Sequence, residues 1–180
     1  MREALKRVSV QRRDKALRYH SETQRRESVA AYLLLCRLLS EEYGIEAYPT
    51  FEEATNGKPF LAGYPHIHFN LSHTRGVAAC VVSDAPVGID VERIRRYNDM
   101  LARRVLSEKE YGLLSNAAEK GVEFIRMWTM KESLLKLTGE GIRRELNGVD
   151  IFDGAYAFLT SVDREKQYVC TVCERRNTEY

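Results

Sequence analysis

The sequence predicts an α+β fold built from two similar lobes, and three observations lead to that prediction. A long helical pattern over residues 24–43 is followed by two strand-like segments that a short turn joins. The second half of the chain repeats this order, with helices and then antiparallel strands. We therefore expect one compact unit with an N-terminal lobe over residues 1–85 and a C-terminal lobe over residues 86–180. Each lobe would be an antiparallel sheet packed with helices, with the active site at the interface of the lobes.

The first half contains one long helix and three strand-like segments. Residues 24–43 repeat apolar side chains at helical spacing, and Gly44 is a natural stop for the helix. Residues 45–61 indicate a short strand followed by a loop, whose NGKP sequence favours a turn. Residues 66–73 and 76–83 have the pattern of two strands, and the HTRG sequence between them predicts a hairpin.

The second half is expected to contain two helices and three strands. Ser107 and Glu110 have the spacing of a capping box, which predicts the start of a helix. The expected elements are a strand over residues 87–94, a helix over 106–115, a helix around Trp128 that ends at Gly139 and Gly141, and strands over 150–162 and 167–175.

Composition and charge argue against several classes of protein. A net charge of +2 is too small to indicate a nucleic-acid-binding protein. The longest apolar run, VAAYLLLC, is far shorter than the roughly 20 residues of a membrane helix. The charged N-terminus lacks the apolar segment of a secretory signal, and the four cysteines form no zinc pattern. We expect a cytoplasmic protein with reduced, mostly buried thiols and no nucleic-acid or membrane partner.

Two charged segments allow more than one interpretation. Residues 6–27 are strongly basic, which suits a solvated helix face, an RNA contact or a subsite for a multiply charged anion. In the helix WTMKESLLKL, Glu132 and Lys136 lie one turn apart among apolar residues. They could form an exposed pair worth about 0.2–0.5 kcal/mol, or they could present a carboxylate and a cation to a polyphosphate.

Asp90 and Glu92 are the strongest signal for a metal ion. They are separated by one residue on a predicted strand, so both side chains project from the same face. Two carboxylates this close repel each other unless a cation lies between them, and oxygen ligands suit Mg²⁺. Gly88 beside the pair leaves room for something to approach, and Glu132 is the candidate for a third carboxylate.

Three further residues are weaker candidates when taken singly. Ser72 and His73 lie at a predicted hairpin end, where they could contact an anion, although a structural histidine is equally compatible. Lys58 lies on a turn, for which a generic structural role is the simpler interpretation. The chain contains no P-loop, GxGxxG, GxSxG or HExxH sequence, so a conventional nucleotide-binding or serine-hydrolase interpretation has no support.

Taken together, the motifs NGKP, FNLSHTRG, VGIDVERI and WTMKESLLKLTGEG resemble those of the 4'-phosphopantetheinyl transferase superfamily. The resemblance is to its longer, two-lobed type, which activates surfactin synthetase and related peptide and polyketide synthetases. The second acidic residue of DVE, Glu92, separates this type from the short trimeric synthases of fatty acid synthesis. Compared with the two-lobed type, the usual N-terminal strand is expected to be missing or shortened here.

The resemblance implies a reaction and a set of residues. The 4'-phosphopantetheine arm of the co-substrate coenzyme A would pass to a serine of an acyl or peptidyl carrier protein, with release of adenosine 3',5'-bisphosphate. Asp90, Glu92 and Glu132 would bind Mg²⁺, Lys136 would face a phosphate, and Glu132 would accept the serine proton directly or through water. The residues implied to bind coenzyme A are Arg12, Lys15, Arg26, Lys58, Pro59, Ser72, His73 and Lys136.

The resemblance also implies a partner, and the residues themselves leave alternatives open. The carrier protein is expected to be an acidic helical bundle, which Arg143 and Arg144 after the Trp128 helix would attract, and the transferase itself is expected to be a monomer. The alternatives are another Mg²⁺-dependent phosphohydrolase, which would use the same carboxylates, and a non-catalytic binding module or scaffold.

Overall fold

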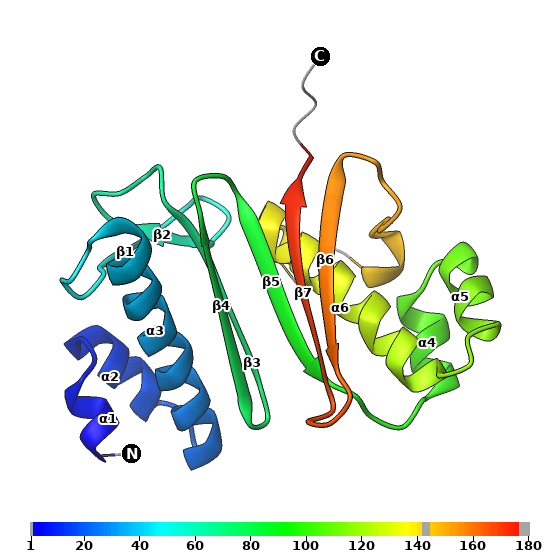
Figure 1. Ribbon diagram of the computed structural model, residues 1–180, viewed down its shortest axis with the longest axis horizontal. Helices are drawn as coiled ribbons and strands as arrows, with labels where there is room; N and C mark the ends of the chain where they lie inside the picture. The colour runs from blue at the N-terminus through cyan, green and yellow to red at the C-terminus, as the bar shows by residue number, and fades with distance from the viewer. Residues whose placement is uncertain (1, 142–144, 177–180) are drawn as a thin grey trace.

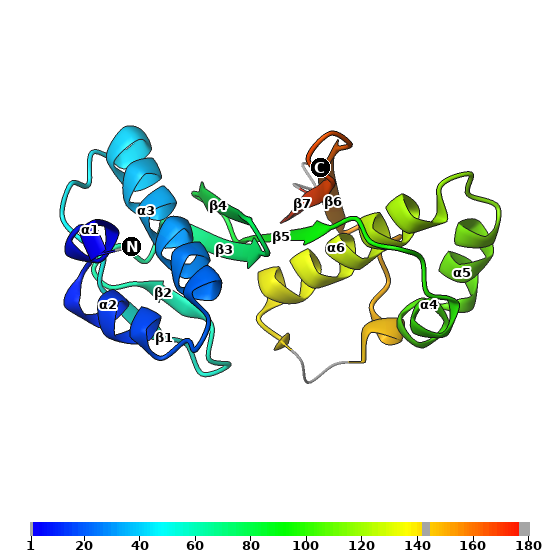
Figure 2. The same cartoon turned by 90° about the horizontal axis from the view of Figure 1, so that it is seen from below.

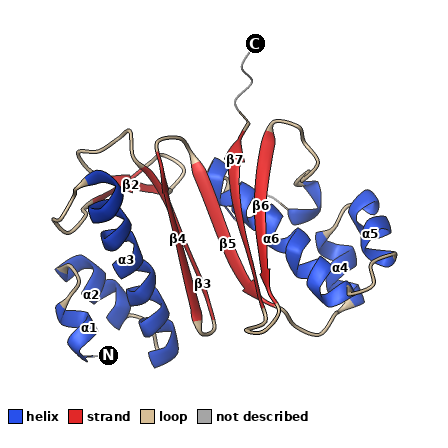
Figure 3. Ribbon diagram, viewed as in Figure 1, coloured by secondary structure: helices blue, strands red, loops and turns tan. Residues whose placement is uncertain are grey.

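The protein has the predicted α+β fold, with helices at both ends of the molecule and strands between them (Figures 1 and 3). The computed structural model describes residues 2–141 and 145–176. The elements of the first half are α1 (Arg2–Lys6), α2 (Val10–Leu17), α3 (Glu22–Tyr43), β1 (Phe51–Glu53), β2 (Pro59–Leu61), β3 (His68–Thr74) and β4 (Val77–Ser83). Those of the second half are β5 (Val87–Arg93), α4 (Asp99–Val105), α5 (Glu108–Ser115), α6 (Lys120–Thr138), the 3-10 turn η2 (Leu146–Gly148), β6 (Tyr156–Asp163) and β7 (Tyr168–Arg175).

The predicted order of a long helix followed by an antiparallel hairpin is present in both halves. Helix α3 precedes the β3–β4 hairpin, and α6 precedes the β6–β7 hairpin. Helix α3 ends at Gly44, whose φ of 67° is the left-handed conformation that glycine adopts easily. Helix α5 begins with the predicted capping box of Ser107 and Glu110. Helix α4 was not predicted, and it begins at Asn98, whose side chain accepts a hydrogen bond from the amide of Leu101.

The first half departs from the prediction in its short elements: the helices α1 and α2 and the strand β2 were not expected. Residues 45–61 were expected to hold a single strand and a loop, but Pro59–Leu61 forms a second short strand, β2, that pairs with β1. Gly57 has a φ of 82°, and the Ala54 amide donates to the Lys58 carbonyl, so the NGK turn folds the chain back on itself. The turn was recognised in the sequence, but strands of three residues are too short to show periodicity.

The two halves meet where β3 runs beside β5. The β3–β4 hairpin and the β5–β7–β6 sheet are separate sheets, and β5 lies between β3 and β7 (Figure 1). Side chains of β3 bridge the junction: Asn70 Oδ1 accepts a hydrogen bond from the Ile89 amide at 3.0 Å, and Ser72 Oγ accepts one from the Val91 amide at 3.3 Å. The alternating polar residues of β3 therefore hold β5 in register.

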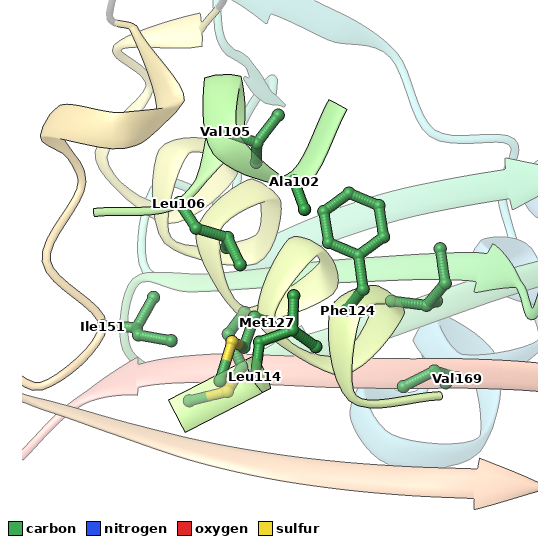
Figure 4. Packing of buried hydrophobic residues seen from close by; sticks show 10 residues of the cluster. Ala102, Val105, Leu106, Leu114, Phe124, Met127, Ile151 and Val169 are labelled. Atoms are coloured by element: carbon green, nitrogen blue, oxygen red, sulfur yellow. The ribbon is translucent and has the colours of Figure 1, made fainter. Parts of the chain in front are cut away.

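Helix α6 crosses one face of the β5–β7–β6 sheet (Figure 2). A Cβ atom at Gly88 would lie 2.0 Å from the Ser133 carbonyl oxygen, so the backbone of α6 occupies the space beside this glycine. The expectation that Gly88 leaves room for something to approach is therefore confirmed, and what approaches it is the backbone of α6. The largest apolar cluster lies under α4, α5 and α6, and Figure 4 shows Phe124, Met127 and Leu114 within it.

The cysteines and helices agree with the sequence analysis only in part. All four cysteines are free thiols, but only Cys173 is buried, while the other three are half-buried. The expectation of mostly buried thiols is therefore too strong. Within the described part of the chain, none of the helices has the combination of length and apolar composition needed to cross a membrane.

Candidate functional site

A cavity of about 400 Å³ lies in the N-terminal half of the chain, where Lys136 of α6 reaches its wall. The segment around α2, helix α3 and strands β1 to β3 form most of its wall, and α6 contributes Lys136. Four residues predicted to bind coenzyme A supply positive or titratable groups to this wall: Arg12, Lys15, His73 and Lys136. The rest of the wall is partly apolar. The lining residues are Gln11, Arg12, Lys15, Tyr19, Ser28, Ala31, Phe51, Glu53, Pro59, Phe69, Asn70, Leu71, His73 and Lys136.

Helix α2 brings Arg12 and Lys15 to the cavity from positions three residues apart, which lie on one face of the helix. The Ser9 side chain caps the helix by accepting a hydrogen bond from the Arg12 amide. The Arg12 guanidinium donates to Ser28 Oγ at 3.2 Å and lies 4.9 Å from the centre of the Tyr32 ring. These contacts hold the guanidinium against α3, where it lines the cavity.

His73 of β3 faces the same cavity between charges of opposite sign. Its Nδ1 lies 3.7 Å from Oε2 of Glu27, a buried carboxylate of α3. Burial lowers the pKa of His73, the positive charges of Lys136 and Arg12 lower it further, and Glu27 opposes them. The free protein therefore disfavours the imidazolium form, although the cavity would favour it once an anion is bound.

Asp90 and Lys136 form the central charged contact of the site. Lys136 Nζ lies 2.6 Å from Asp90 Oδ1 and 2.9 Å from Ser72 Oγ, and Ser72 Oγ donates to Asp90 Oδ1 at 2.9 Å. The other oxygen of this buried carboxylate, Oδ2, has no hydrogen-bond partner in the described part of the protein. Asp90 thus keeps one oxygen available for a further ligand.

Glu92 and Glu132 lie near Asp90. Glu92 Oε2 accepts hydrogen bonds from Thr74 Oγ1 at 3.3 Å and from an Arg95 guanidinium nitrogen at 3.2 Å. Burial raises the pKa of Glu132, and the negative charges of Asp90 and Glu92 raise it further. Glu132 is therefore close enough to Asp90 and Glu92 to be repelled by both. The exposed Glu132–Lys136 pair considered from the sequence is not formed, because Lys136 pairs with Asp90 instead.

These carboxylates fit a hard cation in their chemistry. All their donor atoms are oxygen, Asp90 and Glu92 repel Glu132, and Asp90 Oδ2 is buried without a partner. Among residues 2–141 and 145–176, however, no three acidic, histidine or cysteine side chains stand in a ready ligand geometry. In this structure Lys136 and Arg95 supply the positive charge beside Asp90 and Glu92.

Several predicted site residues lie elsewhere. Arg26 is exposed on α3 and pairs with Glu22 at 2.7 Å. Lys58 turns away from the cavity and donates to the carbonyl oxygens of Leu137 and Val87. Their contacts with a nucleotide stay predictions. The predicted carrier-attracting residues Arg143 and Arg144 lie outside the described residues.

The structure adds residues that the sequence analysis missed. Asn70, Ser72 and Thr74 occupy every second position of β3 and therefore share one face of the strand. Because Ser72 was already a candidate, this strand period could have predicted Asn70 and Thr74 as well. Tyr19 lies edge-on to His73, with ring centres 6.5 Å apart, and lines the cavity. It lies between α2 and α3, and no local sequence pattern marks it.

Comparisons with known proteins agree on one family. Residues 86–176 match the family model described as the 4'-phosphopantetheinyl transferase superfamily. The chain is 38% identical over 138 residues to the 4'-phosphopantetheinyl transferase psf-1 of Bacillus pumilus, an alignment that covers 75% of this chain and 59% of that protein. It is 27% identical over 182 residues to a 4'-phosphopantetheinyl transferase of Bacillus subtilis, covering 92% of this chain and 81% of that protein.

A third relative is the 4'-phosphopantetheinyl transferase gsp of Aneurinibacillus migulanus, which is 32% identical over 143 residues, covering 78% of this chain and 60% of that protein. The chain thus spans about three fifths of the length of the first and third relatives. The family match extends from β5 to β7 and includes β5 and α6, the two elements that hold Asp90, Glu92, Glu132 and Lys136. The chain belongs to the 4'-phosphopantetheinyl transferase superfamily.

Proposed function

We propose that this protein transfers the 4'-phosphopantetheine moiety of coenzyme A to a serine of an acyl or peptidyl carrier protein, with release of adenosine 3',5'-bisphosphate. The observation that supports this most is the contact of Lys136 with Asp90 at the wall of a cationic cavity. The cavity offers positive charge for phosphates, and the carboxylates next to it offer a site for a cation. The relatives' names support the same activity.

The cavity suits the nucleotide end of coenzyme A. Arg12 and Lys15 would contact the 3'-phosphate, and His73 and Lys136 would contact the pyrophosphate. The apolar wall around Phe51 and Phe69 would receive the adenine ring, as binding sites commonly pair apolar surface with a few polar groups. Pro59 contributes to the same wall, and Ser72 would orient Lys136.

Mg²⁺ belongs to this proposal, and Asp90, Glu92 and Glu132 would hold it. When bound, it would neutralise charge that develops on the pyrophosphate oxygens. Lys136 would add a second positive charge, since its Nζ contacts Asp90 and the residue lines the cavity.

The proposed step is a phosphoryl-type substitution at the β-phosphorus. The carrier serine Oγ forms a bond to this phosphorus, while the bond from phosphorus to the bridging oxygen breaks and that oxygen leaves with adenosine 3',5'-bisphosphate. The serine proton passes to Glu132, directly or through a water molecule. The half-buried Glu132 side chain projects from α6 beside the other two carboxylates, which suits either route.

The predicted partner, oligomeric state and cellular location belong to the same proposal. We propose an acidic carrier protein as the partner, a monomeric transferase and a cytoplasmic location. A non-catalytic scaffold would need none of the contacts among Asp90, Lys136 and Ser72.

The test is the intact mass of an apo carrier protein after incubation with this protein, coenzyme A and Mg²⁺. We expect the mass to increase by one phosphopantetheine group, and we expect no increase with a carrier whose acceptor serine is replaced by alanine or with EDTA in place of Mg²⁺. Release of adenosine 3',5'-bisphosphate without carrier modification would instead indicate a phosphohydrolase. No reaction across a panel of acyl and peptidyl carriers would contradict the proposal.

A further inference from the structure

The turn between β1 and β2 reaches across the molecule to the last turn of α6. Lys58 Nζ donates to the Leu137 carbonyl at 3.0 Å and to the Val87 carbonyl at 3.4 Å. Asn56 Nδ2 donates to the Thr138 carbonyl at 3.4 Å. Two side chains of the N-terminal half thus contact backbone oxygens at the C-terminal end of the helix that contains Lys136.

These carbonyls are the groups that a helix leaves without partners. The last four carbonyl groups of an α-helix have no intrahelical donor, and the C-terminal end has partial negative charge. Helix α6 ends at Gly139, whose amide donates back to the Leu135 carbonyl. Lys58 and Asn56 satisfy the carbonyls of Leu137 and Thr138, the last two of the helix, and the ammonium group adds a favourable charge at this end.

The fit around Gly139 shows that the contact is close. Gly139 has a φ of 74°, and a Cβ atom there would lie 2.1 Å from Asn56 Nδ2. The side chain of Asn56 therefore occupies the space that any residue other than glycine would need. The turn and the end of the helix are complementary in shape as well as in hydrogen bonding.

The two acceptors of Lys58 lie next to the proposed catalytic contact in the chain. Leu137 directly follows Lys136, and Val87 begins β5, the strand that contains Asp90. One ammonium group thus connects the last turn of α6 with the start of β5. The distance between Lys136 and Asp90 depends on how these two elements are placed.

We propose that Lys58 is a positioning residue that holds Lys136 against Asp90, and that it is not a ligand of the nucleotide phosphates. Its amino group points at backbone carbonyls, and its side chain lines a separate cavity of about 330 Å³ instead of the cationic one. The catalytic part of this inference rests on the proposed function.

The experiment compares Lys58→Met with the conservative Lys58→Arg and two matched lysine variants. Lys15→Met removes a cation from the cationic cavity, and Lys166→Met removes one from the exposed turn between β6 and β7. For each protein, calorimetry gives the Kd of coenzyme A at several salt concentrations, and the mass assay gives kcat and KM for transfer.

We expect Lys58→Met to lower kcat by about tenfold or more, because small misplacements of catalytic groups are costly. Its Kd for coenzyme A should stay within about twofold of the wild-type value, with the same salt dependence, and Lys58→Arg should recover part of kcat. Lys15→Met should weaken binding by about tenfold and flatten the salt dependence, as expected for a lost charge-assisted contact. Lys166→Met should match the wild type in kcat, in the Kd of coenzyme A and in the salt dependence of that Kd.

The proposal is overturned if Lys58→Met behaves like Lys15→Met, or if it changes neither kcat nor binding. Hydrogen exchange of the free protein gives a readout that does not need the reaction. Amides in the last turn of α6 should exchange faster in Lys58→Met, whereas those of α5 should not change. If the wild-type protein modified no carrier, the proposed function would fail, but the difference in hydrogen exchange would still test the positioning role. Equal exchange in the wild type and in Lys58→Met would exclude that role.

Discussion

Asp90 lies where β3 of the N-terminal half meets β5 and α6 of the C-terminal half. Its Oδ1 accepts hydrogen bonds from Ser72 of β3 and Lys136 of α6, and its Oδ2 is buried without a partner among the described residues. The sequence could place Asp90 and Glu92 on one face, because the period of a strand is two. It could not show that Lys136 pairs with Asp90 and not with Glu132, because that choice depends on how α6 packs on β5.

The first prediction concerns the charge of Asp90. Asp90→Asn keeps the shape of the side chain and an acceptor for Ser72, but removes the negative charge that would bind Mg²⁺. We expect transfer to fall by at least about a hundredfold, because a metal ion contributes several kcal/mol to such steps. Circular dichroism should show an unchanged fold, and Glu165→Gln on the β6–β7 turn should leave the rate unchanged. A wild-type rate for Asp90→Asn at limiting Mg²⁺ would show that the ligand assignment is wrong.

The second prediction concerns the protonation of His73. In the free protein its pKa is lowered, mainly by burial, with Lys136 and Arg12 adding to the effect and Glu27 opposing it; the ring of Tyr19 packs edge-on. A bound phosphate would stabilise the imidazolium and raise this pKa. Binding would then take up a proton, so the affinity for coenzyme A should increase as the pH falls from 7 towards 6.

Calorimetry in buffers of different ionisation enthalpy measures this proton uptake. The His73→Gln variant is the control, because any proton exchange that remains in it comes from groups other than His73, including the phosphates of the ligand. Equal proton uptake by the wild type and by His73→Gln would place the phosphates away from this side chain.

At the scale of elements, α6 combines core packing with the proposed chemistry on different faces. Met127 and Leu134 are buried in the core, and Lys131 is buried as completely as they are. The Lys131 ammonium group bonds to Glu110 Oε2 at 2.7 Å and to the carbonyls of Leu146 and Val149. The capping box that involves Glu110 could be predicted from four adjacent residues, but its ion pair with Lys131 could not, because the two residues meet only when α5 packs on α6.

The third prediction concerns this buried pair. Lys131→Met leaves the Glu110 carboxylate buried and without its counter-charge, so the free energy of unfolding should fall by about 3–5 kcal/mol. Adding Glu110→Gln should recover a large part of the loss. Lys120→Met, on the first exposed residue of α6, is the matched control and should change stability little. Urea denaturation measures all four proteins, and a loss below about 1 kcal/mol for Lys131→Met would show that the pair contributes little.

At the scale of the whole molecule, the cavity exists because segments far apart in the sequence come together. Arg12, His73 and Lys136 line one space, although each lies on a different element. Most of the helices and strands, and most of the candidate site residues, could be predicted from periodicity, turn chemistry and the resemblance to a family, but α1, α2, β2 and α4 could not. Which cations face the cavity could not, and Arg26 and Lys58 show why: each is engaged by neighbours, Glu22 in one case and helix-end carbonyls in the other.

The most direct measurement of the central claim is a crystal structure with coenzyme A and Mg²⁺ bound. The account predicts the 3'-phosphate beside Arg12 and Lys15, and the pyrophosphate between Lys136 and the carboxylates of Asp90, Glu92 and Glu132. It also predicts that Lys58 keeps its bond to the Leu137 carbonyl. A nucleotide bound outside the cationic cavity, or a pyrophosphate that does not contact Lys136, would contradict the account.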